Sequence, residues 1–315
     1  VIYSTHPEAL LQEVADDFTA ETGVPVEFIN LKGGLADRVW SEKDNPQADI
    51  MYGGSTTTFT ELAKQGCYEK TNPSWANELD SNFKDKDGQW YATIQTPVVM
   101  FYNTEMMSES DAPKNYNDLA DSKYADQVVT RDNASSSQRE WICAMIYANS
   151  KDGNMDKANE WLKGLASNTK NYYNSSSMMF KAIGNKEAAI GVSTLNDVQK
   201  NIEKNGMPLK AIDSSDGNVI SVDCVAALKN APHSKAAAKF VEFCGTAKEQ
   251  AKIANSQSRI PTLKSALKDS PEWMQKEMKM LDVDTAALAS HQSEWLDLWN
   301  NTAYDTSKVV EAEKK

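Results

Sequence analysis

Runs of hydroxyl side chains stand at five places in the sequence where a short apolar segment leads into a helical pattern. The richest run lies in DNASSSQ, where Ser135, Ser136 and Ser137 precede an apolar helix. One hydroxyl is enough to cap a helix, because it accepts a bond from a free backbone N–H group of the first turn. Further hydroxyls beside those N–H groups and the positive end of the helix dipole are typical of a site that binds a small anion.

The same order of strand, hydroxyl-rich turn and helix recurs in four other stretches. In VIYSTHPE, Thr5 and Glu8 fit a capping box, with Pro7 in the first helical turn. The remaining stretches are ADIMYGGSTTTF, NYYNSSSMMF and AAIGVSTL. Alternation of strands and helices predicts an α/β fold with largely parallel sheets. Each junction alone is an ordinary cap, but the carboxyl ends of parallel strands meet at one edge, which is where ligands bind.

We therefore expect the ligand site at these junctions. The candidate residues are Ser4, Thr5, His6, Gly54, Ser55, Thr56, Thr96, Asn133, Ser135, Ser136, Ser137, Asn174, Ser175, Ser176, Ser193 and Thr194. Arg131 and Arg139 flank the serine run and could add positive charge, or they could be solvated surface residues. His6 has the same two readings, ligand contact or exposure to solvent.

Composition limits the partners. The chain has 315 residues, is 40% hydrophobic and carries a net charge of -12. This length suits two domains, and the charge disfavours nucleic acid and anionic membranes, which need basic patches. No apolar run approaches the ~20 residues of a membrane span. The opening VIYSTHPE predicts a strand already under way, as in a mature exported protein or a cytosolic fragment.

The cysteines and tryptophans have structural interpretations as well as functional ones. Cys67, Cys143, Cys224 and Cys244 are widely spaced, and we interpret them as buried free thiols rather than disulfides. Trp40, Trp90 and Trp141 could stack on a sugar, although Trp141 is placed one helical turn past the serine run and is expected in the core.

Two long extended stretches, residues 91–103 and 217–228, lack the turn and helix that follow the other strands. We interpret them as crossings between two lobes. The predicted first lobe comprises residues 1–97 and 223–265, and the second comprises residues 98–222 and 266–315.

The succession of VIYSTHPEALLQEVADDFTAETGVPVEF, QADIMYGGSTTTFTELAKQG, DNASSSQ, KEAAIGVST and SRIPTLKSAL resembles the solute-binding proteins of bacterial ABC importers, of the ferric-binding type. That group includes phosphonate, sugar-phosphate and thiamine binders. The resemblance implies a type II periplasmic-binding-protein fold, with two α/β lobes joined by hinge strands and the ligand in a cleft between them. It also implies delivery to permease subunits and an extracytoplasmic location, periplasmic or lipid-anchored. We expect a monomer without a cofactor.

Ferric-binding relatives hold iron with a His after the first strand, a Glu in a turn and two adjacent Tyr. By this resemblance His6 stands at the first position, but Gly54 stands at the Glu position, and Thr194 and Leu195 fall where the Tyr pair is expected. The pair Tyr172 and Tyr173 lies one element earlier. The loop that matches NASSSQ carries a phosphate in those relatives. The resemblance therefore favours a small organic anion, such as a phosphonate or sugar phosphate, with no metal; ferric iron is the alternative.

Two other classes of protein have weaker support in the sequence. Ser265 and Lys268 match the S-x-x-K pattern of acyl-enzyme formers, but so short a pattern arises by chance, and no other catalytic motif accompanies it. A surface adhesin on the same fold would expose a large apolar patch in place of a polar site. We predict a binding protein that is not an enzyme.

Overall fold

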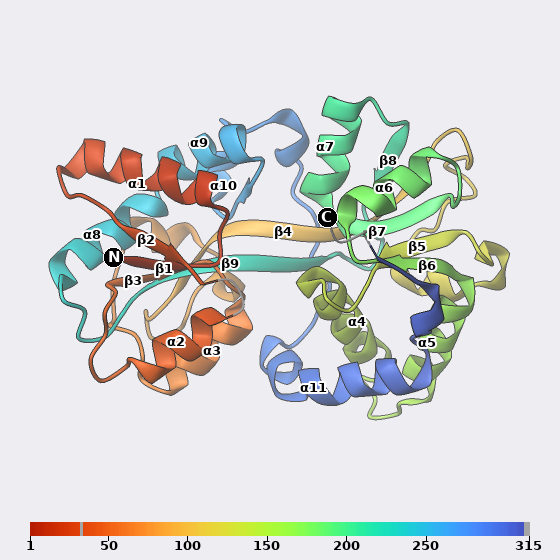
Figure 1. Cartoon of the computed structure of the whole chain (residues 1–315), viewed down its shortest axis with the longest axis horizontal. Helices are drawn as coiled ribbons and strands as arrows, with labels where there is room; N and C mark the ends of the chain where they lie inside the picture. Colours follow the sequence, from red (N-terminus) through yellow and green to blue (C-terminus); the bar gives the residue numbers. More distant parts are fainter. Residues whose placement is uncertain (32–33, 312–315) are drawn as a thin grey trace. The chain divides into compact units, whose positions relative to one another are not determined.

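The computed structural model describes residues 1–31 and 34–311. The chain forms two compact units, residues 1–96 with 222–277 and residues 97–221 with 278–315. It passes from one unit to the other within two long strands, β4 (Tyr91–Asn103) and β9 (Val219–Ala227), and again after residue 277 (Figure 1). The prediction placed residues 266–277 in the second lobe. They belong to unit 1, because α10 (Lys264–Leu267) packs against α9 (Ala247–Gln257) and β10 (Ile260–Pro261).

Unit 1 is built on a parallel sheet in which β1 lies between β2 and β3. Ser4 at the end of β1 is in register with Asn30 and Tyr52, and β9 pairs with β3 in the antiparallel sense. Its further elements are β1 (Ile2–Ser4), α1 (Glu8–Thr22), β2 (Phe28–Asn30), α2 (Leu35–Ser41), β3 (Ile50–Tyr52), α3 (Thr56–Lys64), α8 (Ser234–Cys244) and short 3₁₀ helices at Ser74–Glu78, Ser81–Phe83 and Glu272–Met274.

Unit 2 has strand order β11, β6, β5, β7, β4, and β8 also pairs with β4. The pairs formed by β5 with β6 and with β7 are parallel, so the predicted parallel sheets are confirmed in both units. Its further elements are 3₁₀ helices at Tyr116–Ala120, Ser122–Tyr124 and Thr306–Lys308, β5 (Val128–Arg131), α4 (Ser136–Asn149), α5 (Asp156–Asn168), β6 (Thr169–Tyr173), α6 (Ser176–Gly184), β7 (Ile190–Thr194), α7 (Leu195–Asn205), β8 (Leu209–Ile212), α11 (Thr285–Thr302) and β11 (Val309–Val310).

Aromatic side chains fill the core of unit 2. Trp141 on α4 is fully buried and packs edge-on against Trp161 of α5, with ring centroids 5.8 Å apart. Trp299 on α11 is also fully buried and meets Tyr172 of β6. Large apolar rings of this kind contribute on the order of 2–3 kcal/mol each when buried. The expectation that Trp141 belongs to the core is confirmed, and α11 is part of that core through Trp299.

The start of α1 corrects the predicted capping box. The helix begins at Glu8 with Pro7 at the N-cap, and Thr5 lies two residues too early to accept a bond from the first turn. Pro7 has an extended ψ of 144°, so it ends the loop instead of lying inside the helix. Thr5 is therefore left exposed beside the strand end.

The four cysteines are free and buried, as predicted. Among the described residues, no helix combines the length and the apolar character needed to cross a bilayer.

Candidate functional site

In unit 1, the carboxyl ends of β1 and β3 bring Ser4, His6 and the Gly53–Gly54 turn together. The Ser4 hydroxyl is fully buried and donates to the carbonyl of Tyr52, while the His6 N–H donates to Ser4 Oγ at 3.0 Å. Gly53 has φ of +92°, and a Cβ there would lie 2.8 Å from Thr5 Oγ1 and 3.0 Å from the His6 ring. Glycine therefore allows the turn to approach the imidazole closely.

His6 is a buried imidazole with one nitrogen left open. Its side chain is 4% exposed and meets the Tyr52 ring edge-on at 4.5 Å. Nε2 is buried and has no hydrogen-bond partner within the described part of the chain. Burial lowers the pKa of His6. The negative charge of Asp223 raises this pKa and the positive charge of Arg259 lowers it further, and the net shift is downward, so the ring is neutral at pH 7.

Asp223 and Arg259 are two charged residues of this region that the sequence analysis missed. Asp223 Oδ1 accepts a bond from the Gly54 N–H at 3.1 Å, across 169 positions of sequence. Arg259 lies between α9 and β10, half-buried, and makes no hydrogen bond or ion pair with the residues the structure describes. A lone acid inside the apolar stretch VISVDCVAAL was the available signal for Asp223.

In unit 2, three helices begin where three neighbouring strands end. The strands β6, β5 and β7 lie side by side and run parallel, and α6, α4 and α7 follow them. Their N-termini therefore lie at one edge of the sheet, with their free N–H groups and positive dipole ends.

The serine runs do not cap the helices that follow them. Ser135 and Ser175 stand at the N-cap positions of α4 and α6, yet neither side chain makes a capping bond in the described structure. The hydroxyls instead pair with each other, Ser135 with Ser137 at 3.0 Å and Ser175 with Ser177 at 2.9 Å. The first-turn N–H groups of both helices remain available to another acceptor.

The two arginines beside the serine run hold the backbone of two different segments. Arg131 donates to the carbonyls of Tyr173 and Asn174 at 3.0 and 2.9 Å, which ties β5 to the end of β6. Arg139 donates to the carbonyls of Asn133 and Ala134. Arg139 therefore fixes the loop before α4, Arg131 fixes the end of β6, and each guanidinium adds positive charge there.

The other candidates fall into three groups. Ser55 is a true cap that accepts from the Thr58 N–H, and Thr56 follows it in α3. Three more have hydrogen-bond partners within unit 2. The Asn133 side chain accepts a bond from the Trp299 indole and donates one to Asn300. The Ser176 hydroxyl donates to Asp197, and the Asn174 backbone N–H donates to the Val310 carbonyl. Ser193 is buried in β7. Thr194 stands at the N-cap of α7 and makes no side-chain capping bond among the described residues. Ser136 is exposed, and Thr96 is half-buried in β4.

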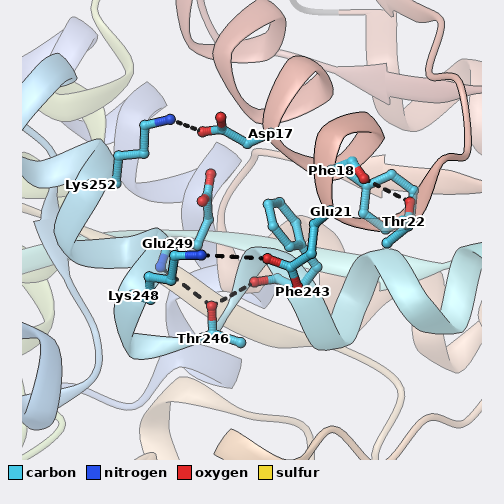
Figure 2. Close-up of polar contacts among 9 residues, drawn as sticks. All are labelled: Asp17, Phe18, Glu21, Thr22, Phe243, Thr246, Lys248, Glu249 and Lys252. Atoms are coloured by element: carbon cyan, nitrogen blue, oxygen red, sulfur yellow. Dashed lines mark hydrogen bonds and ion pairs between the residues drawn. The ribbon is translucent and has the colours of Figure 1, made fainter.

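Unit 1 also buries a carboxyl group where α9 meets α1 (Figure 2). Glu249 is 4% exposed, and in the described structure its Oε1 has no hydrogen-bond partner. Burial raises the pKa of Glu249 to about 7, with Asp17 adding to the shift and Lys252 opposing it. Lys252 is itself paired with Asp17.

The aromatic and serine alternatives have structural explanations. Tyr172 and Tyr173 are buried β6 residues, and burial raises the pKa of both phenols. Of the two other tryptophans considered for stacking on a sugar, Trp90 is buried, with 5% of its surface exposed, and Trp40 lies on the surface, with 53% exposed. The Ser265 hydroxyl donates to Glu78 at 2.7 Å, so it is held by an acceptor that lies outside the S-x-x-K pattern.

No group of three or more His, Cys, Asp and Glu that could hold a metal ion occurs within residues 1–31 and 34–311.

Comparison with known proteins gives consistent matches over most of the chain. Residues 45–287 match the family model of bacterial extracellular solute-binding proteins. A probable ABC transporter periplasmic-binding protein of Sinorhizobium fredii is 27% identical, over 87% of this chain and 78% of that protein.

Solved structures agree on the fold. The Trichodesmium FutA protein in complex with iron and citrate has a TM-score of 0.83 at 18% identity, covering 96% of this chain and 99% of that one. The Actinobacillus pleuropneumoniae protein AfuA with fructose-6-phosphate bound has a TM-score of 0.75 at 22% identity, covering 96% and 97%. The predicted periplasmic-binding-protein fold is confirmed.

Proposed function

Because this chain belongs to the family of bacterial extracellular solute-binding proteins, we propose that its solute is a small organic anion such as a phosphonate or a sugar phosphate. The chain is the solute-binding component of an ABC importer, and such components work with permease subunits in the membrane. Its relatives are binding proteins and not enzymes. The extracellular family description fits an extracytoplasmic location, and attachment through a lipid is part of the proposal.

The observation that carries the proposal is the edge of unit 2, where hydroxyls gather at helix starts without capping them. A charge-assisted hydrogen bond contributes on the order of 1.5–3 kcal/mol and a helix end about 0.3–1 kcal/mol. Four such contacts of about 2 kcal/mol each, or six of about 1.5 kcal/mol each, reach the roughly 8 kcal/mol of a micromolar complex before association costs are subtracted. Hydroxyl and N–H donors on this edge, with Arg131 and Arg139 beside them, thus support anion binding despite the net charge of -12.

Ferric iron is the second candidate, and the open Nε2 of His6 favours it. The FutA match was determined with iron bound. Three residues argue against ferric iron as the solute. At the positions where the resemblance requires a carboxylate and two phenolates, the chain has Gly54, Thr194 and Leu195, which supply neither group. We expect no tyrosinate charge-transfer colour when ferric citrate is added. A stable coloured one-to-one complex would establish the iron alternative.

Native mass spectrometry of the freshly purified protein tests the anion proposal directly. We expect a bound mass corresponding to a phosphorylated or phosphonated compound, which calorimetric titration of the ligand-free protein then reproduces at micromolar affinity or better. Titrations in which methylphosphonate, glucose 6-phosphate and 2-aminoethylphosphonate all fail to bind would count against the proposal.

A further inference from the structure

We propose that the helix α11 positions the loop of residues 132–135 for the anion, with Trp299 as the positioning residue that acts through Asn133. The inference rests on the proposed function, in which the N-terminus of α4 binds the anionic group of the solute. It changes the role of Asn133 from a solute contact, as the sequence suggested, to the residue through which α11 holds the loop.

The side-chain amide of Asn133 is held by α11 at both of its ends. Its Oδ1 accepts a bond from the Trp299 indole N–H at 2.9 Å, and its Nδ2 donates to Oδ1 of Asn300. An indole N–H can only donate, so the amide oxygen must face it and the NH₂ group faces Asn300. The two bonds together determine both the orientation of the amide and the place of the loop against α11.

Trp299 is a fixed point from which the loop can be held. Its side chain is fully buried and contacts the rings of Tyr172 on β6 and Tyr304, with centroids 6.1 and 5.6 Å away. A buried indole N–H without an acceptor costs free energy, which favours keeping Asn133 in place. Because Trp299 is fully buried, it can influence a solute only through the residues that it contacts.

The other bonds of the loop attach it to its immediate neighbours. The carboxylate and the carbonyl of Asp132 accept from the N–H groups of Ala134 and Ser135, both at 3.1 Å. The Asp132 N–H donates to the end of β6, and Arg139 of α4 donates to two carbonyls of the loop. These bonds join the loop to the strand and helix on either side of it, whereas Asn133 joins it to an element more than 160 positions away.

The placement of Asn133 bears directly on the proposed anion contacts. Asn133 stands two residues before Ser135, the N-cap residue of α4. Hydrogen bonds weaken steeply when the donor is displaced or misaligned. Donors that are already held in place also lose less conformational freedom on binding. A loop released from α11 should therefore hold the anion more weakly.

The test compares W299F with its matched control W295F by calorimetric titration with methylphosphonate and glucose 6-phosphate. Both variants replace a buried tryptophan of α11, but Trp295 packs on Tyr147 and His291, whereas Trp299 bonds Asn133. We expect W299F to bind both probes about 5- to 20-fold more weakly, and W295F to bind them within about twofold of wild type.

Hydrogen exchange without a solute measures the loop itself. The amides of Ala134 and Ser135, which donate to Asp132, are expected to exchange about 5-fold faster in W299F and at the wild-type rate in W295F, as followed by NMR. A general loss of core packing would affect both variants alike. The contrast between the two variants therefore distinguishes positioning of the loop from overall stability.

A second pair of variants leaves the core intact. N300A removes the acceptor for Asn133 Nδ2, and N301A makes the same change at the next exposed position of α11. We expect N300A to weaken binding of both probes by about 2- to 5-fold and N301A to leave it unchanged. If W299F does not fold, this pair decides the question.

Three results would contradict the inference. Wild-type affinity in both W299F and N300A would overturn it and leave the proposed function standing. Equal losses of affinity in W299F and W295F, together with equal affinities in N300A and N301A, would assign Trp299 to stability alone. Failure of the wild-type protein to bind either probe would overturn the proposed function together with the inference.

Discussion

The polar edges of the two units use different chemistry at similar strand ends. In unit 1 the helix α3 is capped by Ser55, and the remaining groups are an imidazole, a carboxylate and a guanidinium. In unit 2 the serines at the starts of α4 and α6 pair with one another and leave the helix N–H groups open. Hydroxyl residues before a helix thus serve folding in one unit, and we propose that they serve the ligand in the other.

The largest effect on stability is expected where the Gly53 turn of unit 1 packs closely against Thr5 and His6. G53A introduces a Cβ at positive φ within 2.8 Å of Thr5 Oγ1, so it adds a steric clash to backbone strain. We expect a loss of about 2–5 kcal/mol in the free energy of unfolding, measured with urea.

The control is G66A, which also has positive φ but has no atoms within 4 Å of the added Cβ. It should lose only the backbone contribution of about 1–2 kcal/mol. Equal losses in the two variants would show that the turn does not pack closely on His6.

The second prediction concerns the buried acid of unit 1. The pKa of Glu249 is about 7 in the folded protein, above the ordinary glutamate value of 4.5, so the folded state holds the proton more tightly. The free energy of unfolding therefore falls as the pH rises from about 4.5 to about 7, and the loss is complete above pH 7. E249Q removes this loss and is expected to be more stable than wild type at pH 8, by up to about 3 kcal/mol.

Urea unfolding between pH 5 and pH 8 measures this difference, which should shrink steadily toward pH 5. E21Q is the matched control, because Glu21 is exposed and pairs with Lys248 in the same contact region (Figure 2). It should show little pH dependence. A pH-independent gap for E249Q would contradict a raised carboxyl pKa.

The smallest effects on stability are expected when serine hydroxyls are removed, and they distinguish a serine that caps a helix from serines that do not. S55A removes the acceptor for the Thr58 N–H and should cost about 1 kcal/mol. S175A/S177A removes two hydroxyls that bond each other and should cost less than about 0.5 kcal/mol. Thermal unfolding without ligand gives both values, and a larger loss for the double variant would make its serines structural.

Local patterns in the sequence predicted the elements well because strands, turns and helices are marked by nearby residues. The strand, turn and helix in ADIMYGGSTTTF and the buried Trp141 both follow from nearby residues. The capping box at Thr5 was wrong because Pro7 stays outside the helix. That depends on a backbone angle which the S-x-x-E spacing does not determine.

The site was only partly predictable because its contacts join distant residues. The bond from Gly54 to Asp223 depends on the pairing of β3 with β9, which no short motif encodes. Arg259 stood in the quoted SRIPTLKSAL without any local sign of its proximity to His6. Likewise, nothing in the run SSS indicates that Ser135 pairs with Ser137 instead of capping α4.

Affinity and stability measured together on S135A/S137A test most directly the proposal that unit 2 holds an anion. The control D284A removes a true cap of the same unit, since Asp284 accepts from the first-turn N–H groups of α11. We predict that S135A/S137A melts like wild type but binds its anion about 30- to 1000-fold more weakly, whereas D284A loses about 1 kcal/mol of stability and binds normally. Native affinity in S135A/S137A would contradict an anion-binding role for these serines.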